Sequence, residues 1–278
     1  MNRYPVEEPS GRQDEPFVLV IEIDAWNIRE RTHWGQAEEI RKKGEKPDHW
    51  HWVWTGTVFA LGDRIAKDKR PMILNRGYVA TRQGLDALRE QLHAEAMRRG
   101  LARADKVLIL ADGASWIWNL AEDRFKEAHQ RLNLYHLHQH LWAVARDLYP
   151  EDEKKMKQWI GRKKKKLSTG RSAKVIEDIE NTLTQIAPER REKADKELNY
   201  FKTHQDRMDY DVAKENNEPQ GSGAIESTCR QYQSRFKTVG QFWSTTGDEA
   251  VLSIATFLRN ERMHVLFPHV KLSPHYRN

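Results

Sequence analysis

Three acidic residues, far apart in the chain, have the type and setting to bind divalent metal ions. Asp24 follows the apolar run 17–23, Asp112 follows the apolar run 106–111, and Glu226 lies near the start of a helix-like segment. Acids at the carboxyl ends of strands lie where α/β sheets place their ligands, and Mg²⁺ prefers oxygen ligands. We therefore predict a trio of metal-binding carboxylates. The alternative is two turn residues and a glutamate that complements the helix dipole.

The segment 219–237 is expected to carry Glu226 on an amphipathic helix. Ser222 stands between two glycines and is a suitable N-cap. Small and apolar residues then recur at helical spacing and predict one buried face: Ala224, Ile225, Thr228, Cys229, Tyr232 and Phe236. The same segment has a basic flank that could contact a DNA backbone, although a solvated face is the alternative: Arg230, Arg235 and Lys237.

A second basic group lies in the run 161–166, and we expect it to contact DNA unless it is simply a solvated charge run: Arg162, Lys163, Lys164 and Lys165. His136 is predicted to support the metal site or contact phosphate, with a structural histidine as the alternative. His136 and His140 have no obvious third ligand nearby, which argues against zinc. Trp243 is expected in the core, with a wedge into DNA as the alternative.

Composition indicates a highly charged chain, and its basic balance favours a polyanionic partner. The 278 residues have a formal net charge of +6, a pI of about 9.2 and a mean hydropathy of −0.86. Basic proteins of this kind favour nucleic acid first and anionic membranes second. No apolar run reaches the length that crosses a bilayer, and no secretory signal is visible, so we expect a protein without a membrane partner. The single cysteine, Cys229, suits a reducing cytoplasm.

Four segments are expected along the chain. Residues 1–16 read as a flexible lead-in, 17–150 as the first part of a catalytic core, 151–215 as a basic helical insertion, and 216–278 as the rest of the core. Strands are predicted at 17–24, 50–61, 73–81, 106–112 and 131–135, with 27–47 as a long loop.

Helices are predicted at 81–100, 116–128, 136–149 and 247–265, in addition to the helix of Glu226. The last of these is expected to pack five residues inward: Ala250, Leu252, Ile254, Phe257 and Leu258. Three meandering strands followed by alternating helices and strands predict an α/β fold. The expected form is a ribonuclease H-like mixed five-stranded sheet flanked by helices, with the helical insertion before the last catalytic helix.

Four segments resemble the DDE transposases of bacterial insertion sequences, and most closely the Kra-type group. They are VIEIDAWNI (20–28), LILADGASWIW (108–118), LYHLHQHLW (134–142) and, above all, the stretch 200–243. Its GSG-x-x-E-S segment is specific, whereas an Asp-Gly pair alone is weak. The resemblance covers roughly residues 17–265. The chain departs from the family at two places. Members usually carry a long N-terminal DNA-binding region ahead of the core, whereas here we expect the core to begin at about residue 17, and Asn133 replaces a frequent aspartate.

The resemblance implies a catalytic core whose Asp24, Asp112 and Glu226 bind two Mg²⁺ ions, with Mn²⁺ able to substitute. Asn133 and His136 are candidate supports of this site. The implied function is DNA cleavage and strand transfer on transposon ends and target DNA. A homo-oligomer in the bacterial cytoplasm, associated with the nucleoid, is the expected form. Two alternatives remain: a ribonuclease H-like nuclease that does not join strands, and a domesticated DNA-binding protein without catalysis.

Overall fold

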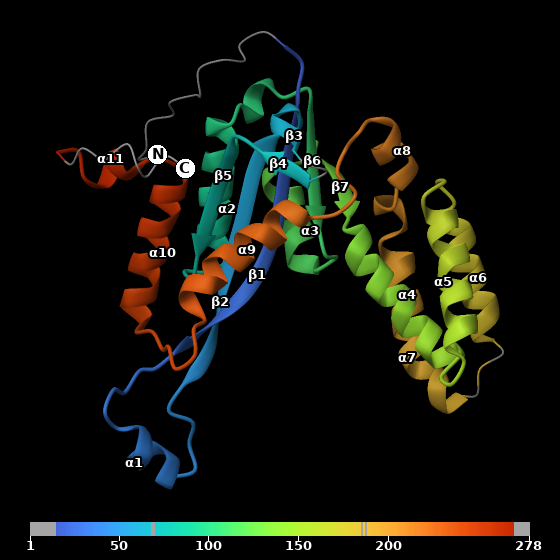
Figure 1. Cartoon of the computed structure of the whole chain (residues 1–278), viewed down its shortest axis with the longest axis horizontal. Coiled ribbons are helices and arrows are strands. Elements are labelled where there is room, and N and C mark those ends of the chain that lie inside the picture. The colour runs from blue at the N-terminus through green and yellow to red at the C-terminus, as the bar shows by residue number, and fades with distance from the viewer. Residues whose placement is uncertain (1–14, 68–69, 185, 187, 270–278) are drawn as a thin grey trace. The chain divides into compact units, whose positions relative to one another are not determined.

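A computed structural model describes residues 15–67, 70–184, 186 and 188–269, and its main feature is a mixed five-stranded sheet (Figure 1). The strand order is β5-β2-β1-β6-β7, and β2 pairs antiparallel with both β1 and β5. The predicted α/β fold is therefore confirmed. The strands are β1 (Val18–Glu30), β2 (His49–Ala60), β5 (Arg76–Thr81), β6 (Lys106–Ala111) and β7 (His129–Leu132), with a separate hairpin of β3 (Arg64–Lys67) and β4 (Arg70–Ile73).

Helices make up most of the remaining described chain, and none of those described is long and apolar enough to cross a membrane. Their bounds are α1 (Ala37–Lys42), α2 (Leu85–Arg98), α3 (Ser115–Arg124), α4 (Leu134–Leu148), α5 (Glu153–Leu167), α6 (Ser172–Leu183), α7 (Pro188–Thr203), α8 (Tyr210–Glu215), α9 (Gly223–Phe236), α10 (Thr245–Arg259) and α11 (Met263–Leu266). Short 3-10 turns occur at Leu61–Asp63, Leu101–Arg103 and Gln205–Arg207.

The chain divides into two compact units. The first takes its described residues from 1–108, 122–128 and 223–278, so it joins the N-terminal strands to α9 and α10. The second comprises 109–121 and the described residues of 129–222, which include β7 and α4 to α8.

Strand β1 is longer than the sequence predicts, and this changes the setting of Asp24. It continues to Glu30 and pairs with β2 along its length, so Asp24 lies mid-strand opposite Thr55 and not at the strand end. The alternation of Trp26 and Ile28 with polar neighbours is the physical reason, because it gives the second half of the strand one buried face. The expected loop 27–47 accordingly begins later and contains α1.

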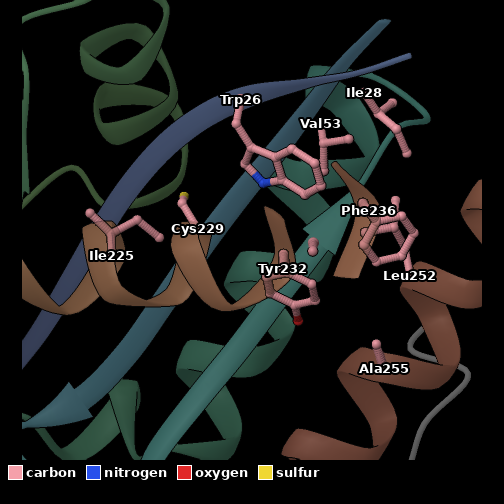
Figure 2. Packing of buried hydrophobic residues seen from close by; sticks show 10 residues of the cluster. Trp26, Ile28, Val53, Ile225, Cys229, Tyr232, Phe236, Leu252 and Ala255 are labelled. Atoms are coloured by element: carbon pink, nitrogen blue, oxygen red, sulfur yellow. The ribbon is translucent and has the colours of Figure 1, made fainter. Parts of the chain in front are cut away.

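One face of the first unit's sheet is covered by α9 and α10. Figure 2 shows α9 beside β1, with Trp26 above Tyr232 and Leu252 of α10 next to Phe236. The opposite face receives α2, whose Leu92 lies against Gly56 so closely that an added Cβ would meet its Cδ1 at 2.6 Å. Both faces of the sheet are thus buried in this unit, as the almost wholly apolar first half of β1 indicates.

Two local predictions were wrong in this unit. The third strand of the sheet starts at Arg76, because the β3–β4 hairpin precedes it. Helix α10 buries Leu252 and Ala255 together with Asp248, whereas Ala250 and Ile254 are exposed. The five residues that were expected to point inward include positions two apart, which share a face in a strand. In a helix, positions three or four apart share a face.

The second unit is held by a buried arginine on β7. Arg131 has no exposed side-chain surface, and its guanidinium donates to the carboxylates of Asp209 and Glu218 at 2.6–2.9 Å. This charge-assisted bonding lowers the pKa of Asp209, although burial opposes the shift. Helices α5 to α8 occupy the predicted insertion, and α4 packs on α5 and α7.

Candidate active site

Asp24 faces α9 because of the alternation of side chains along β1. Glu22, Asp24 and Trp26 share one face of the strand. The Glu22 carboxylate accepts a hydrogen bond of 2.8 Å from the backbone N–H of Ile225, and Trp26 stacks on Tyr232 with a centroid distance of 6.4 Å. Asp24 therefore lies between two contacts that join β1 to α9.

The charges of Asp24 and Glu226 both act on Cys229. Its thiol is buried. Burial raises the pKa of the Cys229 thiol, and the negative charges of Asp24 and Glu226 raise it further. Glu226 precedes Cys229 by three residues and so shares its face of α9. Residues 202 positions apart in sequence are thereby brought together within the first unit, and both acids remain partly exposed.

Glu22 is a third acid at this point that the sequence analysis did not single out. Its side chain is buried, and burial raises its pKa to about 7 against hydrogen bonds from the Ile225 and Ala224 backbone and the charge of Arg76. The signal was available, since Glu22 is the charged residue inside the apolar run and lies two positions before Asp24. Its carboxyl caps the first turn of α9 from β1.

Ser222, the predicted N-cap, directly precedes α9, and its capping role stays a prediction. Its hydroxyl accepts a hydrogen bond from the Asn133 side-chain amide. Asn133 itself is buried and accepts a bond of 2.9 Å from the Tyr135 backbone, which caps α4. Its backbone N–H donates to the carbonyl of Ala111, the residue before Asp112. Asn133 therefore supports the chain next to Asp112 through backbone geometry.

Asp112 occupies a rigid turn in the second unit. Its carboxylate accepts a hydrogen bond of 3.0 Å from the Ala114 backbone, and its own carbonyl accepts one of 2.6 Å from the Tyr200 hydroxyl. Gly113 has φ +101°, and a Cβ there would lie 2.6 Å from the Tyr200 oxygen. Glycine is thus required for two reasons, backbone conformation and close approach of α7.

Aromatic and imidazole rings pack around this turn. Tyr200 stacks on His140 with a centroid distance of 3.6 Å, and His140 contacts the Glu197 carboxylate at 2.6 Å. His204 lies edge-on to Tyr200, and burial lowers its pKa to about 4, with Arg207 and His140 adding to the shift. His204 is therefore neutral near pH 7. The ring of His136, by contrast, lies edge-on to Tyr135.

The predicted DNA-contacting residues differ in accessibility. Arg230, Arg235 and Lys237 of the first unit are exposed, as are Arg162 and Lys165 of the second, and Lys164 is partly exposed. The prediction that Lys163 contacts DNA was wrong, because its side chain is only 8% exposed and its ammonium binds Asp178 at 2.6 Å. The helical spacing of α5 turns this one lysine of the basic run inward beside Trp159.

The donor atoms suit a hard divalent ion, because Asp24 and Glu226 supply carboxylate oxygens at a partly exposed point. In the part of the chain that the structure describes, no group of three or more His, Cys, Asp or Glu side chains is gathered to hold a metal. Mg²⁺ is commonly held by one or two carboxylates with water and phosphate, so two acids match that mode. Asp112 belongs to the other unit, and its part in a shared site stays a prediction.

Sequence comparison places most of the chain in one family. Residues 62–264 match UPF0236, described as an uncharacterised protein family. The matched stretch contains Asp112 and Glu226, and Asp24 precedes it. No curated protein matches the chain.

Proposed function

Since the chain belongs to the UPF0236 family, which is described without an activity, its function has to be argued from its own residues, and we propose that it is a DDE transposase core. In this proposal it cleaves DNA phosphodiesters and transfers strands with divalent metal ions. The resemblance of its Asp24, Asp112 and Glu226 segments to those of DDE transposases supports the assignment.

The observation that carries the proposal is that α9 packs on β1, so that the charges of Asp24 and Glu226 both act on the Cys229 thiol. An acid in the middle of a buried strand has a desolvation cost, and a second acid nearby adds repulsion. Glu22 adds a third carboxyl on the same strand face. Carboxylates gathered in this way repel one another when no cation is bound. Such a cluster is typical of a functional site, because a bound cation relieves the repulsion.

Each residue of the trio has a defined task in this reaction. Asp24 and Glu226 would hold the ions, positioned in turn by β1 and α9, and Asp112 would complete the set from its rigid turn. The ions, when bound, activate the attacking oxygen and stabilise the leaving oxygen in an in-line displacement. In cleavage the attacking oxygen belongs to water and the broken bond is P–O3′. In strand transfer the attacking oxygen is the freed 3′-hydroxyl, and the bond that breaks is a P–O3′ bond of the target strand, whose 3′ oxygen leaves.

DNA is the proposed partner, both as transposon ends and as target. Arg230 and Arg235 are exposed on α9, the same helix that carries Glu226, and would contact the phosphate backbone. A homo-oligomer that holds paired ends and a location in the bacterial cytoplasm are parts of the same proposal.

A cleavage and joining assay tests the function. Labelled linear and supercoiled DNA is incubated with Mg²⁺ or Mn²⁺ and with the wild type or one of three isosteric variants, Asp24→Asn, Asp112→Asn and Glu226→Gln. We expect each variant to lose cleavage while its circular dichroism spectrum is unchanged. Glu122→Gln, which alters an exposed acid on α3, is the matched control and keeps activity.

The products separate the three candidate functions. Joined products support the transposase, cleavage without joining supports a nuclease, and DNA binding that no variant alters supports a non-catalytic protein. Ion binding is measured separately by the thermal midpoint, because a ligand of the folded state raises it. Mn²⁺ should raise the midpoint of the wild type and have a smaller effect on Asp24→Asn and Glu226→Gln.

A further inference from the structure

The β1–β2 ribbon continues past the end of β5 and carries an unusual set of aromatic side chains. β5 pairs with β2 only from Trp54 to Phe59, so the residues before Trp54 have β1 as their sheet partner. Figure 1 shows this ribbon running on from the sheet to α1. All of these residues belong to the first unit.

Three tryptophans occupy alternate positions on this part of β2 and therefore share one face: Trp50, Trp52 and Trp54. Successive rings are spaced by about 7 Å, since each strand residue advances about 3.3 Å. Trp50 is 59% exposed and Trp52 is 54% exposed. Helix α2 covers the same face at Gly56, beyond the last of the three. Two large aromatic rings are thus left open to solvent on a regular strand.

Cations accompany these rings. Arg29 lies opposite Trp50 in the strand register, with its guanidinium 5.8 Å from the Trp50 ring centre, and the Lys237 ammonium lies 5.8 Å from the same ring. Arg31 lies close by, over Trp34, which is itself 55% exposed. Asp48, whose side chain is 12% exposed, forms ion pairs with Arg29 and Arg31 and so offsets one of the three positive charges here. The tryptophan surface, defined as Trp50, Trp52, Arg29 and Lys237, has net positive charge.

We propose that the tryptophan surface binds an unpaired DNA strand, with bases stacked on Trp50 and Trp52 and phosphates held by Arg29 and Lys237. Planar rings beside cations are the combination that binds single strands with little sequence preference. The proposal rests on the proposed function in taking DNA as the partner, and it adds that the protein holds bases exposed from the duplex.

Duplex DNA and a second copy of the chain fit this surface less well. In a duplex the base faces are stacked on one another, so the rings would have only backbone to contact. A symmetric contact between two copies would bring the cations of both surfaces together, which opposes association. An unpaired polyanion satisfies the rings and the charges at once.

Binding of a fluorescein-labelled oligothymidylate, measured by anisotropy, tests the proposal. The Trp50→Leu/Trp52→Leu variant keeps apolar side chains but removes the flat rings, and both sites are exposed, so we expect it to fold. Its affinity for the single strand should fall at least tenfold, because stacking contributes about 1–3 kcal/mol per base. Tyr135→Leu, at an aromatic residue 60% exposed in the other unit, is the control and should bind as the wild type does.

The outcomes separate this proposal from the proposed function. Loss of single-strand binding in the tryptophan variant, with duplex binding retained, supports the tryptophan surface. Unchanged single-strand binding overturns it and leaves DNA as the partner. If the wild type binds neither form of DNA, the proposed function fails as well. A change only in the mass of the assembly, measured by light scattering, identifies the surface as a contact between copies and also overturns the proposal.

Discussion

The Tyr200 hydroxyl donates a hydrogen bond of 2.6 Å to the backbone carbonyl of Asp112, a residue 88 positions earlier in the chain. This bond joins α7 of the helical insertion to the turn that carries a predicted metal ligand. The local sequence around Tyr200 or Asp112 does not predict this contact. Through this bond the helical insertion supports the backbone at Asp112.

We predict that Tyr200→Phe weakens this support while the ring stack on His140 remains. Loss of one hydrogen bond should lower the free energy of unfolding by about 1 kcal/mol, measured by urea denaturation. If Asp112 acts in catalysis, kcat should fall with little change in KM, because the turn is positioned less firmly. Tyr135→Phe is the matched control. An unaltered stability and rate would show that the bond has no role.

Gly113→Ala is predicted to be more damaging. The positive φ and the approach of Tyr200 both act against a Cβ, and together they should destabilise the protein by about 2 kcal/mol or more. Gly161→Ala is the contrasting variant, since this helical glycine has open space around its position and should gain about 1 kcal/mol. Thermal unfolding of the two variants measures both effects. Equal behaviour of the pair would contradict the account of the Asp-Gly turn.

The buried pair of Glu30 and Asp248 should make stability fall as pH rises. Burial raises the pKa of Asp248 from 3.8 to about 7, and its hydrogen bond to Glu30 adds to the shift. The folded protein therefore holds a proton that the unfolded chain releases above about pH 4. Stability should decline by roughly 1 kcal/mol per pH unit between about pH 5 and pH 7.

Asp248→Asn tests this directly, because the amide can still donate to Glu30 but does not titrate. Burial raises the pKa of Glu30, but its hydrogen bonds with Asp248 and Arg82 lower it below the usual value. Glu30 therefore changes its charge only at lower pH. His49 and His51 also lie near Glu30 and remain in the variant. Urea denaturation at several pH values should show a reduced slope in Asp248→Asn. A slope equal to that of the wild type would overturn the assignment to Asp248.

The basic run on α5 should separate into a structural residue, Lys163, and DNA-contacting residues, of which Arg162 and Lys165 are the most exposed. Lys163→Met removes a buried ion pair and should lower the free energy of unfolding by about 1–2 kcal/mol without changing DNA affinity, since Lys166 still binds Asp178. Arg162→Gln and Lys165→Gln should have the opposite pattern. Removal of one phosphate-binding cation should reduce the slope of log affinity against log salt by about 0.9. A Lys163→Met variant that folds normally and no longer binds DNA would reverse the assignment.

Several features were predictable because they depend on local sequence. The apolar runs ending near Asp24 and Asp112, and the helical spacing after Gly223, are strong enough to predict the strands, α9 and the α/β sheet. Trp243 was also placed correctly, since it packs against the buried cluster around Phe236. These patterns can be recognised in the sequence because a helix or strand with one buried face places its apolar residues at the same spacing in any protein.

Other features depend on contacts between distant residues, and tertiary structure alone decides them. The sequence by itself determined the five-stranded α/β sheet, the helix α9 and the acids that these elements carry. It did not determine that Glu22 caps α9, that Lys163 turns inward, or that Tyr200 reaches Asp112. The physical reason is that periodicity tells which face of an element is buried, whereas the partner on that face is set by packing of distant segments, as for Glu22 and Ile225, which are 203 residues apart.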